Sequence, residues 1–427
     1  MRNTIILGAG LAGLSAAYHL KHKYELIEGS DRSGGIAGSV KINGFTFDHA
    51  IHILFTKDPY ASGLIRSLLG SNFLEQKRSS WIYSNDRYTP YPYQGNMKGL
   101  PKRIIWENMF GLLLRKFYTK AKSANNFEEW IGKRFGTGIA KNFMIPFNKK
   151  VWAAELRSMS HDWIDDRVQE PRFRDVAKGI YSKTRTDYGP NATFWYPVHG
   201  GTSALPDSFL PHVQGIQYGQ KCIGINPETQ TLDFQTGKKE KYEILISSLP
   251  LPQLIAIIKN VPHEVRVAAG KLKANRVTTV NLGIDREAIS DKHWVYFPEE
   301  RFLFQRISFP MNFSTSLVPS GTSSIMAEIS SSDYRPLPKS NIVEQSISQL
   351  TSIGVLRKND RILVKKLIHI EPAYIIYTPE HRESVDIIHC YLRSIGIIPC
   401  GRFGEWEYLN MDQTILSGKR AAEEAEI

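Results

Sequence analysis

The sequence has few cysteines and no long hydrophobic run. Only Cys222, Cys390 and Cys400 occur in 427 residues, too few to staple a chain of this length, which favours a reducing compartment. The longest stretch that is poor in charge, residues 4–18, is shorter than the roughly 20 residues that cross a bilayer. We therefore expect a soluble, cytoplasmic protein with no membrane span.

The sequence also lacks the signatures of a nucleic-acid-binding protein. It has 54 basic and 42 acidic residues, a net charge of +12, but the basic residues are spread along the chain. Zinc-finger spacing, an RNA-recognition signature and a dense Lys/Arg tract are all missing. We expect no nucleic acid and no metal, and if the charge has a ligand, a small phosphorylated molecule is the better candidate.

Three glycines near the start form a dinucleotide-binding fingerprint. Gly8, Gly10 and Gly13 fit G-x-G-x-x-G between a β-branched run and a stretch of helix formers. Glu28 ends the next predicted strand, residues 24–27, where a carboxylate can accept hydrogen bonds from ribose hydroxyls. The alternative is a structural glycine turn beside an unrelated surface glutamate.

A second glycine cluster favours FAD over NAD as the cofactor. Gly34, Gly35 and Gly38 follow the acidic residue directly and allow the backbone to run close to the rest of a long dinucleotide. This two-glycine start resembles that of the amine-oxidase-like flavoproteins. The segment 401–404, predicted as a loop before the last helix, resembles the closing segment of the same superfamily.

The remaining patterns predict an α/β protein with interleaved domains. Residues from about 97 to 165 have helical periodicity with Trp106, Phe110 and Trp130 as aromatic anchors, and strand-rich segments cover about 215–250 and 275–380. We expect a Rossmann-type FAD-binding domain, an inserted helical domain and a mixed or antiparallel β-sheet substrate domain. The predicted ranges are 1–75, 191–270 and 385–427 for FAD binding, 97–190 for the helical domain, and 76–96 and 271–384 for the sheet.

Eight ordered motifs give a more specific resemblance. They are TPYPYQ (89–94), FEEWI (127–131), PFNKKVW (146–152), DDRV (165–168), GPNATF (189–194), GGT (200–202), WVYFP (294–298) with Arg306, and GRFGEWEY (401–408). In this order they resemble the UDP-galactopyranose mutase family, eukaryotic-type branch, over essentially the whole chain. The resemblance implies a reduced FAD whose N5 attacks the anomeric carbon, converting a UDP-hexopyranose to its furanose form, a galactofuranose donor for cell wall polysaccharide.

The resemblance also implies the site residues. The catalytic residues would be His52, Arg167 and Arg306, the two arginines binding the diphosphate. The implied substrate-binding residues are Tyr91, Gln94, Asn148, Trp152, Asn191, Tyr296 and Tyr408. Those implied for FAD are Gly8, Gly10, Gly13, Glu28, Gly35, Arg402 and Asp412. Arg78 and Ser80 match positions for a reducing nucleotide, NADPH or NADH, and a homo-oligomer is possible.

Four positions depart from the family pattern. Ala50 and Ile51 replace two glycines before His52, which narrows the site above the flavin. Ile376 aligns with a diphosphate-binding tyrosine, for which Tyr374 and Tyr377 are candidate replacements, and Asp187 replaces an asparagine. Two alternatives therefore stay open: an oxidoreductase of the protoporphyrinogen or amine oxidase type, and a non-catalytic flavoprotein that binds a nucleotide-sugar.

Overall fold

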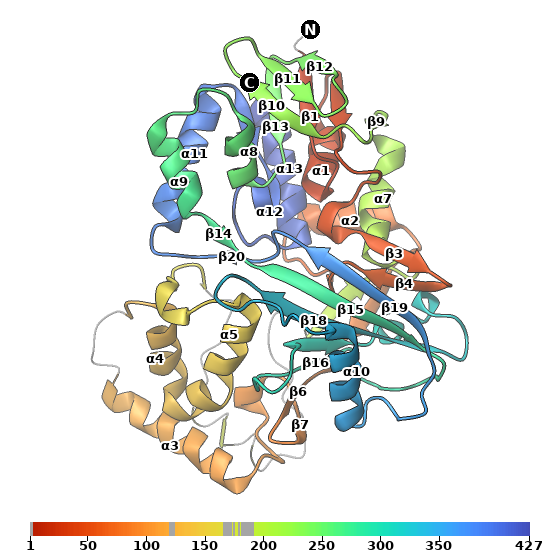
Figure 1. Cartoon of the computed structure of the whole chain (residues 1–427), viewed down its shortest axis with the longest axis vertical. Helices are drawn as coiled ribbons and strands as arrows, with labels where there is room; N and C mark the ends of the chain where they lie inside the picture. The colour runs from red at the N-terminus through yellow and green to blue at the C-terminus, as the bar shows by residue number, and fades with distance from the viewer. Residues whose placement is uncertain (1–2, 119–123, 165–172, 174–175, 178–179, 181–191) are drawn as a thin grey trace.

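The computed structural model describes residues 3–118, 124–164, 173, 176–177, 180 and 192–427. Arg167, Asp187 and Asn191 lie outside the described residues. Figure 1 shows an elongated molecule with both termini at one end and helices α3, α4 and α5 at the other.

A parallel five-stranded sheet occupies the end that carries the termini. Its strands, in spatial order, are β21 (Ile397–Pro399), β13 (Ile244–Ser247), β1 (Thr4–Leu7), β2 (Tyr24–Ile27) and β9 (Ile216–Gln217). Every residue of β1 is buried, as expected for a central parallel strand covered on both faces. The predicted α/β class and the Rossmann-type arrangement are confirmed.

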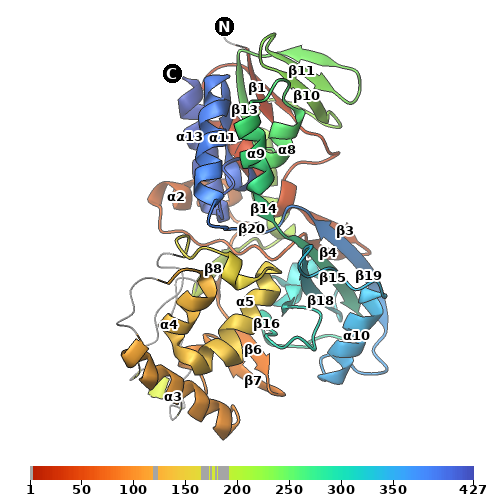
Figure 2. The ribbon, with the colours of Figure 1, turned by 60° about the vertical axis from the view of Figure 1, so that its left-hand side comes forward.

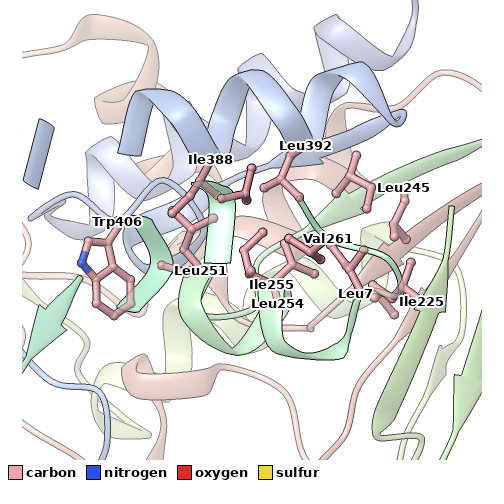
Figure 3. Packing of buried hydrophobic residues seen from close by; sticks show 14 of the residues in the cluster. Leu7, Ile225, Leu245, Leu251, Leu254, Ile255, Val261, Ile388, Leu392 and Trp406 are labelled. Carbon is pink, nitrogen blue, oxygen red and sulfur yellow. The ribbon is translucent and has the colours of Figure 1, made fainter. Parts of the chain in front are cut away.

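Helices cover both faces of this sheet. Ile6 of β1 belongs to a core shared with α1 (Leu11–His19) and α13 (Met411–Ala425). Ile5 and Leu7 face the opposite core, seen in Figure 3. That core is built on α8 (Leu251–Ile257), α9 (His263–Lys271) and α11 (His381–Ser394).

The predicted strand, turn and helix at the N-terminus are present. Gly8 has a φ of +96°, and a Cβ on Gly13 would lie 1.9 Å from the carbonyl oxygen of Gly8. Helix α1 can therefore pack this closely against the turn only because Gly13 has no side chain. The prediction of a loop over residues 401–404 is wrong, because Gly401–Gly404 forms the single-turn helix α12. The Gly401 N–H donates to Ser417 Oγ of α13 at 2.6 Å, which fixes this turn.

The second large sheet of the molecule is mixed and has seven strands. Its order is β19 (Ile362–Ile370), β15 (Arg276–Ile284), β18 (Ser323–Ser331), β17 (Arg306–Ser308), β16 (Trp294–Tyr296), β6 (Ser80–Ser84) and β7 (Arg87–Pro90). β16 runs parallel to β6, and the other neighbours are antiparallel. Tyr296 pairs with Arg306 across β16 and β17, which brings these two side chains to one face.

Smaller elements connect these layers. The short sheets are β3 (Ser39–Ile42) with β4 (Phe45–Asp48), β5 (Leu74–Lys77) with β8 (Thr193–Tyr196), β14 (Lys273–Ala274) with β20 (Ile375–Ile376), and β10 (Cys222–Asn226) with β11 (Thr231–Phe234) and β12 (Lys239–Lys241). Three more helices are α2 (Pro59–Leu69), α7 (Ala204–Phe209) and α10 (Ile342–Ser352). The exact domain boundaries stay predictions.

The inserted helices lie beside the mixed sheet, as Figure 2 shows. They are α3 (Lys102–Tyr118), α4 (Phe127–Ile139) and α5 (Ile145–Trp152). The prediction that Trp106 and Phe110 anchor the core is wrong, because both side chains are exposed on α3, whereas Trp130 is half-buried. Among the described residues, no helix is both long enough and apolar enough to span a bilayer.

Candidate active site

Two adjoining cavities lie between the parallel sheet and the mixed sheet. One has a volume of about 410 Å³ and is lined by the glycine-rich turns, and the other has about 340 Å³ and is lined by strands of the mixed sheet. Four residues line both: Ile36, His52, Arg402 and Met411. We refer to them as the dinucleotide cavity and the tyrosine cavity.

The dinucleotide cavity brings together the predicted nucleotide-binding residues. Gly8, Gly10, Glu28 and Gly35 all line it. A Cβ on Gly10 would have no other protein atom within 4 Å, so the missing side chain leaves open space at the start of α1. Helix N-termini in this position attract phosphate. The Glu28 carboxylate is held in place by the backbone N–H of Ala9, which donates to it at 2.7 Å.

The C-terminal segment forms the opposite wall of this cavity. Arg402 donates from Nε to the Leu409 carbonyl at 2.8 Å, and its guanidinium carbon lies 4.8 Å from the centre of the Tyr408 ring. Asp412 lies in the first turn of α13, beside the lining residue Met411. Its Oδ1 is buried and has no hydrogen-bond partner among the described residues. A carboxylate in this position is favoured by the helix dipole.

Polar side chains gather in the tyrosine cavity. Tyr296, Arg306, Tyr374 and Tyr408 line it, and the rings of Tyr374 and Tyr408 stack with centroids 6.0 Å apart. Phenol hydroxyls and a guanidinium are hydrogen-bond donors. This group can therefore bind an anion with several oxygens.

Arg306 is held by a buried carboxylate. Its Nε and Nη2 donate to the two oxygens of Glu328 at 2.9 and 2.8 Å, and only 1% of the Glu328 side chain is exposed. Burial, the largest single influence, opposes the charge on Arg306, but Glu328 together with Tyr374 and Tyr296 outweighs burial and raises the pKa of the guanidinium. Within the described part of the chain, Nη1 makes no hydrogen bond, so it can donate to a ligand oxygen.

His52 lines both cavities as a neutral side chain. Its Nδ1 lies 2.9 Å from the carbonyl oxygen of Ala50, an acceptor, so Nδ1 carries the proton and Nε2 is left as an acceptor. Burial, together with the charges of Arg402 and Arg306, lowers the pKa of His52 to about 3. The imidazole is therefore uncharged at neutral pH.

The structure selects one of the two candidate tyrosines near Ile376. Tyr374 lines the cavity, whereas Ile376 belongs to the hydrophobic core of the helical part. The Tyr377 hydroxyl donates to Glu407 at 2.9 Å and accepts from the backbone N–H of Tyr408 at 2.7 Å, which keeps it behind the cavity wall. Tyr374 is thus in the position to replace the missing tyrosine.

The resemblance implies four further described residues for substrate binding. Tyr91, Gln94, Asn148 and Trp152 are not among the described residues that line the cavity. Tyr91 contacts Tyr296 with centroids 5.4 Å apart, and Trp152 contacts Tyr374 at 5.9 Å. The Trp152 Nε1–H donates to Asn148 Oδ1 at 3.2 Å. Their part in binding stays a prediction.

The residues predicted to bind a reducing nucleotide are buried. Arg78 is 5% exposed and lies over the Tyr91 ring at 5.2 Å, and Ser80 is fully buried in β6. Neither is among the described residues that line the two cavities. Their role stays a prediction.

Sequence analysis missed three residues of the site and its support: Glu328, Trp294 and Lys150. Glu328 binds Arg306, as described above. Trp294 is 5% exposed and lines the tyrosine cavity, and its indole N–H has no hydrogen-bond partner in the described ranges. An unpaired buried donor at a cavity wall is a candidate ligand contact. Its position two residues before Tyr296 on one strand was the available signal.

Lys150 connects α5 to the strands that carry Tyr296 and Arg306. Its Nζ donates to the carbonyl oxygens of Phe297, Glu299 and Phe304 at 2.8, 2.9 and 2.7 Å. These carbonyls belong to the segment that joins β16 to β17. Lys150 is 1% exposed, so the ammonium group is fully engaged by protein. Its signal in the sequence was only its place in the PFNKKVW motif.

A model of the family described as flavin containing amine oxidoreductase matches residues 11–425. The chain belongs to this family. The dinucleotide cavity fits the flavin cofactor, because the glycine turn, the Gly10 opening and Glu28 are all in place. FAD is therefore the cofactor that the family and the cavity both support.

Solved structures are similar over the whole chain. A crystal structure of reduced UDP-galactopyranose mutase superposes with a TM-score of 0.95 at 29% identity, covering 100% of this chain and 94% of that one. This match confirms the resemblance inferred from the motifs. A putative protoporphyrinogen oxidase from Exiguobacterium sp. 255-15 gives a TM-score of 0.75 at 14% identity, covering 100% and 98%, and shares the fold.

Two of the curated relatives are named as protoporphyrinogen oxidases. Protoporphyrinogen oxidase 2 of Arabidopsis thaliana is 24% identical over 275 residues, which cover 56% of this chain and 52% of the relative. Protoporphyrinogen oxidase of Macaca fascicularis is 22% identical over 321 residues, 66% of each. The chain thus matches about half to two thirds of the length of these relatives.

Proposed function

We propose that this protein is a flavin-dependent mutase that interconverts the pyranose and furanose forms of a UDP-sugar. The observation that carries the proposal is the set of donors in the tyrosine cavity: Arg306 with Tyr296, Tyr374 and Tyr408, adjoining the flavin site. The likeness to reduced UDP-galactopyranose mutase supports it. The sugar is galactose or a relative such as N-acetylgalactosamine or arabinose.

Arg306 binds the diphosphate of the substrate. When the sugar–oxygen bond breaks, negative charge grows on the departing diphosphate, and a fixed cation stabilises that charge. Glu328 fixes the guanidinium through Nε and Nη2, so Nη1 is already oriented to bind the ligand and little side-chain entropy is lost on binding. Arg167, which lies outside the described residues, is proposed as the second cation.

The tyrosines and the flavin complete the reaction. Phenol hydroxyls add neutral donors that keep the diphosphate close until it is needed for the return step. A reduced flavin in the adjoining cavity would supply the electron-rich nitrogen that the ring rearrangement needs. NADPH or NADH is the proposed source of the reducing electrons.

His52 orients the sugar at the boundary between the cavities. Its neutral Nε2 accepts a hydrogen bond from a sugar hydroxyl, since Nδ1–H is already donated to Ala50. An imidazolium here would add positive charge beside Arg402 and Arg306, and these arginines help to prevent it. His52 therefore acts in our proposal as a hydrogen-bond acceptor.

The second candidate function is an oxidoreductase of the protoporphyrinogen or amine oxidase type. The names of the curated relatives favour it. Arg306 has no evident use for a cationic amine, and a porphyrinogen could meet it only through its propionate carboxylates. The curated oxidases are 22–24% identical over about half to two thirds of their length, whereas the mutase structure is 29% identical over the whole of this chain. We therefore place this function second.

One experiment separates the candidates. Holoprotein reduced with dithionite is incubated with a panel of UDP-sugars, and the nucleotide-sugars are separated by chromatography while dissolved oxygen is followed. The mutase forms a second UDP-sugar isomer only when reduced and consumes no oxygen in proportion to product. Peroxide formed with an amine or a porphyrinogen, and no isomer, would support the oxidase. UDP binding without either reaction would leave a binding protein.

A further inference from the structure

Helix α3 presents a large apolar face to solvent. Trp106, Phe110 and Leu113 are 74%, 62% and 44% exposed. Their spacing of four and then three residues puts them on one face of the helix. Both views of the ribbon place α3 at the outer edge of the helical part, far from the termini (Figures 1 and 2).

The opposite face of α3 is fixed against α4 by close backbone contact. A Cβ on Gly138 would lie 2.1 Å from the Glu107 carbonyl oxygen, and one on Gly111 would lie 2.5 Å from the Gly138 nitrogen. Asn108 and Leu112 on this inner face are buried. The helix cannot rotate to bury its aromatic residues without losing this fit.

The same segment concentrates positive charge. Residues 98–115, whose side chains the structure describes, contain four basic residues and one acidic residue, a net charge of +3. Lys102 and Arg103 in the first turn of α3 are exposed. The acidic residue, Glu107, is already bonded to Arg103 at 2.9 Å.

We propose that this face of α3 is a docking surface for a membrane that contains anionic lipids. Trp and Phe side chains partition into the interface between headgroups and acyl chains, and neighbouring Lys and Arg bind lipid phosphates. The helix would lie in the plane of the membrane without crossing it. Docking places the protein on a bilayer, whatever reaction its cavities catalyse, so this proposal does not depend on the proposed function.

The charge argues against a second copy of the chain as the partner. In a two-fold dimer the same face of each copy meets its equivalent, so α3 would approach α3. The basic segments of both copies, each with a charge of +3 over residues 98–115, would then be brought together. An anionic lipid surface, in contrast, attracts the basic residues of α3.

Vesicle binding tests the proposal. Full-length FAD-loaded protein is floated with vesicles of phosphatidylcholine alone, or of phosphatidylcholine mixed with phosphatidylglycerol. We expect binding to the mixed vesicles only, weakened by added salt. The Trp106→Ser/Phe110→Ser double variant should bind at least about tenfold more weakly, because it loses two interfacial aromatic residues. Lys102→Glu/Arg103→Glu should also lose about tenfold or more, since each basic residue contributes about fivefold near an anionic surface.

The control removes exposed apolar residues elsewhere. Ile223 on β10 and Val267 on α9 are 52% and 44% exposed, and Ile223→Ser/Val267→Ser should bind vesicles as the wild type does. Equal vesicle binding by wild type and the α3 variants would overturn the proposal. It would also be overturned if the wild type ignores anionic vesicles while the aromatic variant lowers the molar mass measured by light scattering, which would assign the face to a second copy.

Discussion

Replacing Arg306 by alanine tests the diphosphate site most sharply. The change removes a cation that lines the tyrosine cavity and leaves Glu328, which is 1% exposed, without its partner. Removing one charge that stabilises a transition state typically lowers turnover by about 100- to 1,000-fold. Leaving a buried carboxylate unpaired costs about 3–5 kcal/mol in the free energy of unfolding. Arg306→Ala should therefore lose both activity and stability.

Two further variants separate these effects. Arg286 forms a comparable two-pronged pair with Asp360, at 2.8 and 2.7 Å, and is not among the described lining residues. Arg286→Ala should lower the melting temperature but leave the Kd for UDP unchanged. Arg306→Leu/Glu328→Leu removes both charges of the cavity pair, so it should recover most of the lost stability without recovering UDP binding.

The assay is UDP titration of the holoprotein by calorimetry, with turnover measured on the same samples. The expected result is a Kd that rises in both Arg306 variants and not in Arg286→Ala. If the double variant binds UDP and turns over like the wild type, Arg306 has no part in the site and the reasoning fails.

Three further predictions concern other residues of the site. Trp294→Phe removes the unpaired N–H, so it should lower kcat/KM for the nucleotide-sugar about tenfold, the value of one lost hydrogen bond. The smaller ring leaves a cavity in a buried position, so the melting temperature should also fall, but an unchanged kcat/KM would show that the N–H contacts no substrate. Lys150→Met leaves three carbonyls without their donor and should lower the free energy of unfolding, measured by urea denaturation, by about 3 kcal/mol or more. Lys98→Met, at an exposed position, should leave it unchanged, and equal urea midpoints for the two variants would refute the prediction. The folded-state pKa of His52, about 3, lies below its ordinary 6.5, so its contribution to stability is complete above pH 6.5 and is lost as the pH falls toward 3. The free energy of unfolding should fall by up to about 1.4 kcal/mol per pH unit in this range. His52→Gln should flatten this slope in urea titrations, and an identical slope would contradict the burial of a neutral imidazole.

The sequence was sufficient for features that depend on local contacts. The glycine turn after β1 and the strand at Tyr24–Ile27 were predicted from spacing, because the tight turn and the close approach of the helix both require glycine. The motifs also led to Arg306, Tyr296 and Tyr408, which the fold brings to one cavity.

What could not be predicted depends on partners that are distant in the chain. Glu328 meets Arg306 through strand pairing, and Lys150 meets carbonyls almost 150 residues away, so no local pattern marks either contact. Helical periodicity identified α3 but not which of its faces would find a neighbour. That is why Trp106 was expected in a core and is instead exposed.

The central claim is that the bond between the anomeric carbon and the diphosphate breaks and re-forms in this protein. It is tested by UDP-galactopyranose labelled with ¹⁸O in the bridging oxygen of that bond. The account predicts that reduced holoprotein moves the label into the non-bridging oxygens of the β-phosphate, that oxidised protein does not, and that Arg306→Ala is strongly impaired. Label that stays in the bridging position with every UDP-sugar the reduced protein binds would contradict it.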